Sequence, residues 1–187
     1  TQTTYLYGKN PLREALLSIK RGKTSPITKL FLTRFAEEEP SIMSLVQSNK
    51  IDYSTLTSQE MESMVGRDAV HQGVLATLNE KALYTSLEEV MSTTDTDSQN
   101  PVFVILDSLQ DPHNVGAIIR SAVGFGASAI IMGEYEQVPI TGTVIKSSAG
   151  TSFAIPIVKV TNINATIIKL KEKGFWAYGL TGDGDTT

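Results

Sequence analysis

Cysteine is absent from the 187-residue sequence, and histidine occurs only twice, as His71 and His113. Without cysteine the chain forms no disulfide, offers no thiolate nucleophile and builds no zinc knuckle. The two histidines lie far apart in the sequence, so a zinc site built on histidine is not expected. The composition therefore excludes thiolate chemistry and predicts no metal site.

Long apolar runs are missing as well. No stretch approaches the ~20 apolar residues that span a bilayer, and the N-terminus lacks the charged-then-apolar pattern of a signal peptide. We therefore expect a protein of the cytoplasm or of an organelle matrix. Hydrophobic residues make up 41% of the chain and charged residues 19%, which is typical of a globular protein. At ~100–200 residues per domain, the length allows one domain or two small ones.

Negative charge prevails overall, but it is unevenly distributed. The formal net charge is −4. Residues 1–35 contain seven bases and one acid, or +6, whereas residues 36–187 contain nine bases and nineteen acids, or −10. The seven bases are Lys9, Arg13, Lys20, Arg21, Lys23, Lys29 and Arg34. A basic segment of this kind is more often an ordinary solvated helix face than a phosphate-binding surface, because it attracts polyanions without specifying a sequence.

Periodicity predicts a small α/β unit in the first eighty residues. Asn10-Pro11 opens a helix in which apolar residues recur at helical spacing up to Gly22. The other expected elements are strands over 27–33, 51–53 and 71–78 and helices over 41–48 and 58–65. A short helix over 86–91 follows, and residues 92–100 contain no large apolar side chain, which is typical of a linker or surface loop.

The remaining residues alternate between buried strands and helices. Strands are expected over 102–106, 129–132, 153–158 and 175–180, and helices over 115–125 and 161–173. This order is typical of an open parallel α/β sheet, in which ligands bind outside the carboxyl ends of the strands. Residues 107–114 and 181–185 occupy those positions. We therefore expect a domain over 1–80, a linker over 81–100 and a second domain over 101–187.

The segment from Asp107 to Ala122 carries the strongest signal. Asp111-Pro112 fixes a turn directly after a buried strand, and Asn114 is expected at a helix N-terminus, where its side chain can cap exposed N–H groups. Gly116 allows another backbone to approach closely. Arg120 presents a planar fork of donors to phosphate or ribose oxygens, although a surface ion pair explains an arginine here equally well.

Four blocks of the sequence resemble the SpoU-type (TrmH-like) RNA ribose 2'-O-methyltransferases of the SPOUT superfamily. The first block of the catalytic domain is similar across Asp111, Pro112, Asn114, Val115, Gly116, Ala117, Arg120, Ser121 and Ala122. Residues 146–150, Lys-Ser-Ser-Ala-Gly, resemble the family's middle block. Residues 7–11 and 71–74 resemble the two ends of its appended RNA-binding domain. The four blocks occur in the family's order and cover nearly the whole chain.

This resemblance implies a fold and a reaction. The fold is a small ribosomal-protein-like α/β domain followed by a knotted parallel-sheet domain. The implied reaction transfers a methyl group from S-adenosylmethionine to a ribose 2'-hydroxyl, most similarly to the bacterial and organellar enzymes that methylate a guanosine of large-subunit ribosomal RNA. It implies Arg120 and Asn114 as catalytic residues, Thr181 and Gly182 as cofactor contacts, and a homodimer. Lys9, Arg13, Lys20, Arg21 and Lys23 are the expected RNA contacts.

The sequence also departs from the family. The family's Gly-Glu-Gly and Ser-Leu-Asn blocks, which form the knot and most of the cofactor pocket in its members, do not occur in these 187 residues. We therefore expect an incomplete second domain and a chain that is inactive alone. A non-catalytic RNA-binding or ribosome-assembly protein on the same scaffold remains the alternative. His113 is a weaker candidate for a general base, and Tyr5 and Tyr7 either stack on RNA bases or pack in the core.

Overall fold

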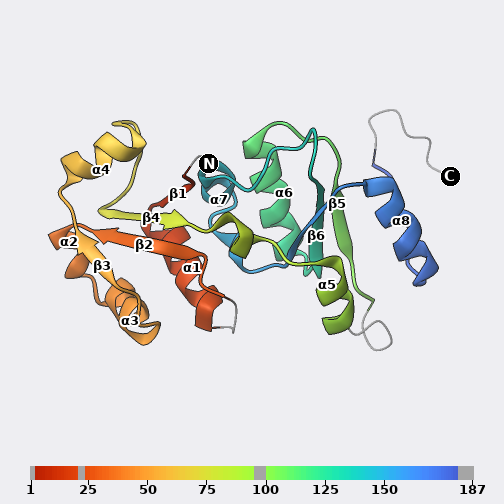
Figure 1. Cartoon of the computed structure of the whole chain (residues 1–187), viewed down its shortest axis with the longest axis horizontal. Coiled ribbons are helices and arrows are strands. Elements are labelled where there is room, and N and C mark those ends of the chain that lie inside the picture. Colours follow the sequence, from red (N-terminus) through yellow and green to blue (C-terminus); the bar gives the residue numbers. More distant parts are fainter. Residues whose placement is uncertain (1–2, 21–23, 95–99, 181–187) are drawn as a thin grey trace.

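The computed structural model describes residues 3–20, 24–94 and 100–180, and it contains two β-sheets that lie side by side (Figure 1). The first sheet is formed by residues 5–78 and the second by residues 103–160. The elements of the first part are β1 (Tyr5–Tyr7), α1 (Lys9–Lys20), β2 (Ile27–Leu32), α2 (Arg34–Glu37), α3 (Pro40–Ser48), β3 (Tyr53–Thr55), α4 (Ser58–Val65) and β4 (Val74–Leu78).

The first sheet is mixed and has the strand order β1-β4-β2-β3. Strand β4 pairs antiparallel with both β1 and β2, and β3 adds to β2 in parallel. Helix α1 buries Leu12, Ala15 and Leu16, which recur at the spacing of one helix face. The predicted helices and strands of this part are present, with shifted strand ends, and the three-residue β1 and four-residue α2 are additional.

The second sheet is parallel, with the order β5-β6-β7. The elements from residue 80 onward are the 3-10 helix η1 (Glu80–Leu83), α5 (Leu87–Thr93), β5 (Phe103–Leu106), α6 (Pro112–Gly124), β6 (Ala129–Gly133), α7 (Gly142–Ser147), the 3-10 helix η2 (Thr151–Phe153), β7 (Ile157–Val160) and α8 (Ile163–Glu172). Every residue of β6 is buried, as expected for a central strand covered on both faces. The predicted α/β class and parallel sheet are confirmed.

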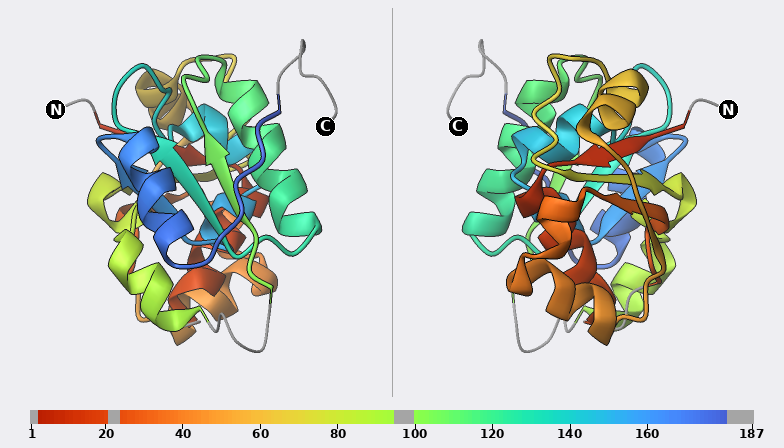
Figure 2. Two further views of the ribbon diagram at one scale, coloured as in Figure 1. Left: turned by 90° about the vertical axis from the view of Figure 1, so that its right-hand side faces the viewer. Right: turned by 90° about the vertical axis from the view of Figure 1, so that its left-hand side faces the viewer.

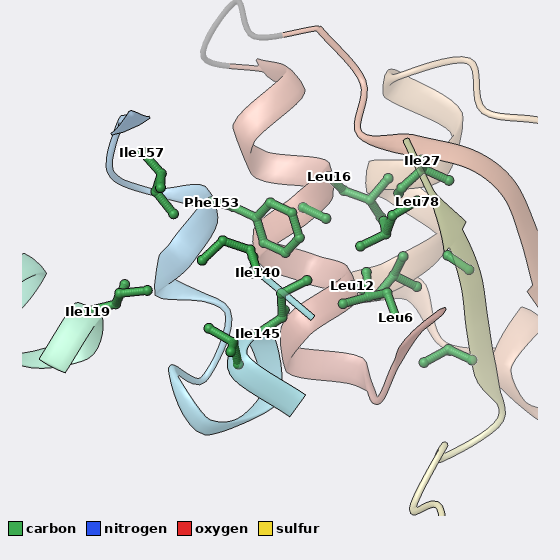
Figure 3. Close-up of a cluster of buried hydrophobic side chains, with 14 of the residues drawn as sticks. Leu6, Leu12, Leu16, Ile27, Leu78, Ile119, Ile140, Ile145, Phe153 and Ile157 are labelled. Atoms are coloured by element: carbon green, nitrogen blue, oxygen red, sulfur yellow. The ribbon is translucent and has the colours of Figure 1, made fainter. Parts of the chain in front are cut away.

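One hydrophobic cluster connects the two sheets. It includes Leu6 and Leu16 of the first part together with Ile119, Ile145 and Phe153 of the second, and Figure 3 shows the side chains around η2 and α7. The close packing is visible in the glycines as well: a Cβ atom on Gly142 would lie 2.3 Å from the carbonyl oxygen of Tyr5. The two parts therefore pack against each other through α7 and β1 (Figures 1 and 2).

The strand expected over residues 175–180 is wrong. This segment has no regular secondary structure, and Trp176, Tyr178 and Leu180 are exposed. Only its first residue is anchored, since the Phe175 ring stacks on Phe103 of β5 at a centroid distance of 4.8 Å. A strand requires a hydrogen-bonded neighbour as well as an apolar sequence, and this segment pairs with none of the described strands.

Two boundaries also differ from expectation. Strand β7 begins at Ile157 rather than at residue 153, because η2 occupies residues 151–153 and Pro156 has no N–H to donate. Helix α6 begins three residues early, at Pro112. Helix α5 confirms the short helix expected over 86–91, whereas η1 was not expected. Residues 95–99 of the expected linker lie outside the described residues. None of the helices in the described ranges is long and apolar enough to cross a membrane.

Candidate active site

Two loops form the carboxyl edge of the parallel sheet, and hydrogen bonds hold them together. The loop after β5 meets the loop after β6: the Val138 N–H donates to the Leu109 carbonyl at 2.9 Å, and the Leu109 N–H donates to Gln137 Oε1 at 2.9 Å. The Gln110 side chain donates to the Glu136 carbonyl at 3.1 Å. Because Gln137 is itself buried, this edge is a fixed surface beside the start of α6.

The N-terminus of α6 is capped by Asp111. Its carboxylate accepts the His113 N–H at 2.8 Å, and Pro112 occupies the first helical position, where a missing N–H costs nothing. Asn114 was expected as the cap, and this is wrong: it lies in the first turn of α6, with an exposed side chain. Its amide is free of hydrogen bonds to other described residues, so it remains available to a ligand.

Arg120 lies in the middle of α6 and is exposed. It has no ion pair with any residue that the structure describes, so the surface ion pair that would explain it without a function is not observed. Six helical residues advance the chain by ~9 Å and ~600°, which places Arg120 and Asn114 on different sides of α6. His113 precedes Arg120 by seven residues and therefore lies on nearly the same side.

Gly116 is the point at which α6 touches α7. A Cβ atom there would lie 2.0 Å from Ser147 Oγ and 2.9 Å from the backbone nitrogen of Ser148, so the predicted close approach is confirmed. The Ser147 hydroxyl donates within this junction, with the carbonyl oxygens of Thr143 at 2.8 Å and Pro112 at 3.2 Å as acceptors. The middle block thus packs α7 against α6, and the Ser147 hydroxyl is hydrogen-bonded to backbone carbonyl groups.

The expected RNA contacts are only partly described. Lys9 is half-buried, forms an ion pair with Glu39 and lies over the Phe35 ring, 5.6 Å from its centroid. The hydrogen bond from Lys9 lowers the pKa of the Glu39 carboxyl. Arg13 is exposed on α1. Lys20 ends α1, and Arg21 and Lys23 lie outside the described residues, as do the expected cofactor contacts Thr181 and Gly182.

Sequence reasoning missed two features of this region. The Gln137 side chain joins the loop after β6 to the loop after β5, although the sequence around it does not distinguish it from a surface glutamine. Lys146 of α7 lies over the ring of Tyr7, 5.3 Å from its centroid, so half-buried Tyr7 contributes to the junction between the two parts. Within the described ranges, the structure contains no group of three or more side chains that could hold a metal ion.

Two family models match the chain. Residues 5–84 match a model described as RNA 2'-O ribose methyltransferase substrate binding, and residues 101–187 match the SpoU rRNA Methylase family. The Bacillus subtilis (strain 168) protein YacO, whose name places it in the TrmH family of tRNA/rRNA methyltransferases, is 31% identical over 180 residues, which is 95% of this chain and 69% of YacO. The 23S rRNA (guanosine-2'-O-)-methyltransferase RlmB of Pseudomonas putida (strain KT2440) is 33% identical over 147 residues, 78% of this chain and 57% of RlmB.

Solved structures share the fold. The AdoMet-bound rRNA methyltransferase of Sinorhizobium meliloti superimposes with a TM-score of 0.66 at 20% identity, covering 90% of this chain and 58% of that chain. The SpoU methyltransferase AviRb of Streptomyces viridochromogenes, in complex with AdoMet, gives 0.67 at 19% identity, covering 91% and 58%. This chain thus spans less than two thirds of each of these structures. Nothing in the comparisons supports the expectation that the chain is inactive.

Proposed function

Because this chain belongs to the SpoU/TrmH family of RNA methyltransferases, we propose that its complete protein methylates a ribose 2'-hydroxyl of RNA. The methyl donor is S-adenosylmethionine, which supplies a methyl group already activated by the sulfonium charge. The catalytic part of this proposal rests on Arg120. This residue is exposed on the helix that begins at the carboxyl edge of the sheet, and it has no ion-pair partner among the described residues.

Arg120 stabilises the negative charge that develops on the ribose oxygen. A guanidinium remains protonated throughout the accessible pH range, so electrostatic stabilisation is a more favourable role than proton abstraction, and the adjacent phosphate can receive the proton. Donors aimed at a developing oxyanion are among the largest contributions to catalysis. Arg120 is free for this role because no carboxylate of the described structure neutralises it.

Asn114 acts separately, as a group that positions the ribose. Its amide is free and exposed in the first turn of α6. Since it lies on a different side of the helix from Arg120, the two side chains contact different groups of the substrate. Alignment of the reacting groups is worth up to ~7–11 kcal/mol in well-oriented reactions, so a positioning role is sufficient for a large effect.

We place the methyl donor at the carboxyl edge of the parallel sheet, because ligands of open α/β sheets bind outside the carboxyl ends of the strands. The two loops joined through Gln137 form a fixed wall there. We assign the cofactor contacts to Thr181 and Gly182 by resemblance to the family. His113 lies on nearly the same side of α6 as Arg120 and is the second candidate for receiving a proton.

The substrate is ribosomal RNA, and its target nucleotide is a guanosine. The support for this finer proposal is RlmB of P. putida, whose name states a guanosine of 23S rRNA. Residues 1–80 form the domain that binds the RNA, residues 81–100 are the linker, and residues 101–187 belong to the catalytic domain. The two family-model matches, over residues 5–84 and 101–187, support a division of this kind. The complete protein acts as a homodimer in the cytoplasm or in an organelle matrix.

Arg120→Ala in the complete protein tests the catalytic assignment. Loss of one oxyanion-stabilising group lowers kcat by about 10²–10³, with RNA affinity retained because Arg120 contributes chiefly in the transition state. Arg120→Lys serves as the matched control, since it keeps the charge and loses the planar fork; we expect an intermediate rate. Near-normal methylation by Arg120→Ala with RNA binding intact would overturn the role of Arg120.

A further inference from the structure

Phe35 lies on α2, beside the first sheet, and 75% of its surface is exposed. Arg34 precedes it, and Val70, which is 60% exposed, belongs to the loop before β4. Single exposed apolar residues are common, so exposure alone carries no conclusion. What distinguishes Phe35 is that rigid elements hold it in solvent beside a positively charged side chain.

The support beneath Phe35 is tightly packed. Thr33 caps α2 by accepting the Ala36 N–H, and its own N–H donates to the Gly73 carbonyl at 2.9 Å. Gly73 has a positive φ of 79°, and a Cβ atom there would lie 2.5 Å from Thr33 Oγ1. Helix α2 is therefore fixed against the loop before β4, so a ligand that covers Phe35 has to order the side chain but not the backbone that carries it.

A second set of contacts places a cation beside the ring. The Lys9 N–H donates to Gln72 Oε1 at 2.9 Å, and its ammonium group pairs with Glu39 while lying 5.6 Å from the Phe35 centroid. An aromatic ring with a cation nearby is a favourable surface for stacking a flat heterocycle. Because Lys9 is engaged by Glu39, it is held in place rather than free to follow a phosphate.

The charges near Phe35 do not form a phosphate-binding site. Two cations lie here, Lys9 and Arg34, against three acids that follow Phe35 in the sequence: Glu37, Glu38 and Glu39. Such a balance does not attract an anion. A nucleobase, by contrast, is uncharged and presents an aromatic face to the ring.

We propose that an unpaired base of the RNA substrate stacks on Phe35, so that α2 contributes a base-recognition surface to the substrate-binding domain. This assignment rests on the proposed function, because the family-model match over residues 5–84 is what makes RNA the ligand. Of the two alternatives left open for Tyr5 and Tyr7, their half-buried positions in β1 favour packing, whereas the ring of Phe35 is open to solvent.

The test compares two RNAs of equal length, a hairpin with an unpaired loop and a blunt duplex, in binding to the 187-residue chain. Phe35→Ala weakens binding of the hairpin by about 5- to 150-fold, the range for loss of one stacked base. Binding of the duplex is unchanged, because its bases are already stacked. The slope of affinity against salt concentration also stays the same, since no phosphate contact is removed.

Two control variants separate stacking from a change of fold. Tyr53→Ala removes another aromatic side chain of the same domain, one that is 38% exposed on β3, and leaves both affinities unchanged. Phe35→Trp restores binding of the hairpin. In a Trp176→Phe background, which removes the single native tryptophan, the fluorescence of the new side chain is quenched by the hairpin and not by the duplex.

Three outcomes would count against the assignment. Equal loss of hairpin and duplex binding by Phe35→Ala would replace stacking with a general effect on the domain. Unchanged hairpin binding by Phe35→Ala would overturn the role of Phe35 and leave the proposed function intact. Failure of the unaltered chain to bind either RNA would overturn RNA binding itself, and the stacking assignment with it.

Discussion

At the scale of single residues, the site depends on which side chains are engaged and which are free. Ser147 and Lys9 are engaged, the first by backbone carbonyls and the second by Glu39. Arg120 and Asn114 are exposed, with neither an ion pair nor a hydrogen bond from their side chains to other residues in the described ranges. Residue type alone does not distinguish these roles, because lysine, serine and arginine are all ordinary surface residues.

Gly116 provides a test of the α6–α7 contact. Gly116→Ala places a Cβ atom 2.0 Å from Ser147 Oγ and 2.9 Å from the Ser148 nitrogen, and overpacking of this kind costs about 1–3 kcal/mol. This exceeds the ~0.5–1 kcal/mol that alanine gains over glycine in a helix. We expect a lower free energy of unfolding in urea. Gly124→Ala, on the same helix with nothing within 4 Å, is the control; equal effects of the two substitutions would refute the contact.

The Lys9–Glu39 pair predicts a pH dependence. Lys9 holds the pKa of the folded Glu39 carboxyl below its usual value, so the pair stabilises the fold above the unfolded pKa of about 4.3. This stabilisation is lost as the pH falls through the lowered pKa of the folded state. The difference in unfolding free energy between the unaltered chain and Lys9→Met is therefore present at pH 7 and vanishes in acid. Urea titrations over a pH series measure it. Lys29→Met, at an exposed site on β2, is the control. If the stability difference between the unaltered chain and Lys9→Met does not change with pH, the Lys9–Glu39 pair is not the cause of that difference.

At the scale of elements, α6 links the sheet to the site. The loop after β5 leads directly into α6, and Asp111 caps the N-terminus of the helix. All three side chains proposed for substrate chemistry, those of His113, Asn114 and Arg120, depend on this start. The N-cap therefore fixes the start of the helix, and the glycine contact together with the buried side chains of Val115, Ile119 and Ala122 fixes the rest of it.

Asp111→Ala removes the cap of α6. We expect a loss of about 0.5–2 kcal/mol in the free energy of unfolding, the usual cost of removing an N-cap side chain. Asp111→Asn keeps the accepting oxygen and retains nearly full stability. Thermal or urea unfolding of both variants measures this. Identical stabilities for the alanine and asparagine variants would show that the carboxylate oxygen does not cap the helix.

Sequence patterns predicted the elements better than their partners. Apolar spacing located α1 and α3, and short apolar runs located β5 and β6, because burial imposes its pattern on the residues of one element. The same pattern predicted a strand over 175–180, where no described neighbour pairs with it. Helix α7 was missed because six residues are too few for a period to emerge. The cap was assigned to Asn114 rather than to Asp111, since both residue types favour caps and only the backbone decides.

At the scale of the whole molecule, the two parts are packed rather than merely connected. The cluster containing Leu6, Ile145 and Phe153 crosses between the sheets, and Lys146 lies over Tyr7. No pattern within one part predicts this junction, because it depends on a glycine at residue 142 and a carbonyl at residue 5. The substrate-binding domain is consequently oriented relative to α6 by packing.

The most direct test of the central proposal is to locate the transferred methyl group. The complete protein is incubated with unmodified ribosomal RNA and S-adenosylmethionine labelled in its methyl group, and the RNA is then hydrolysed with alkali. A ribose 2'-O-methyl group blocks cleavage of the adjacent phosphodiester, so we predict that the label remains in an alkali-resistant dinucleotide that contains guanosine. Label recovered in single nucleotides, which would place the methyl group on a base, or no label in the RNA at all, would contradict a ribose 2'-O-methyltransferase.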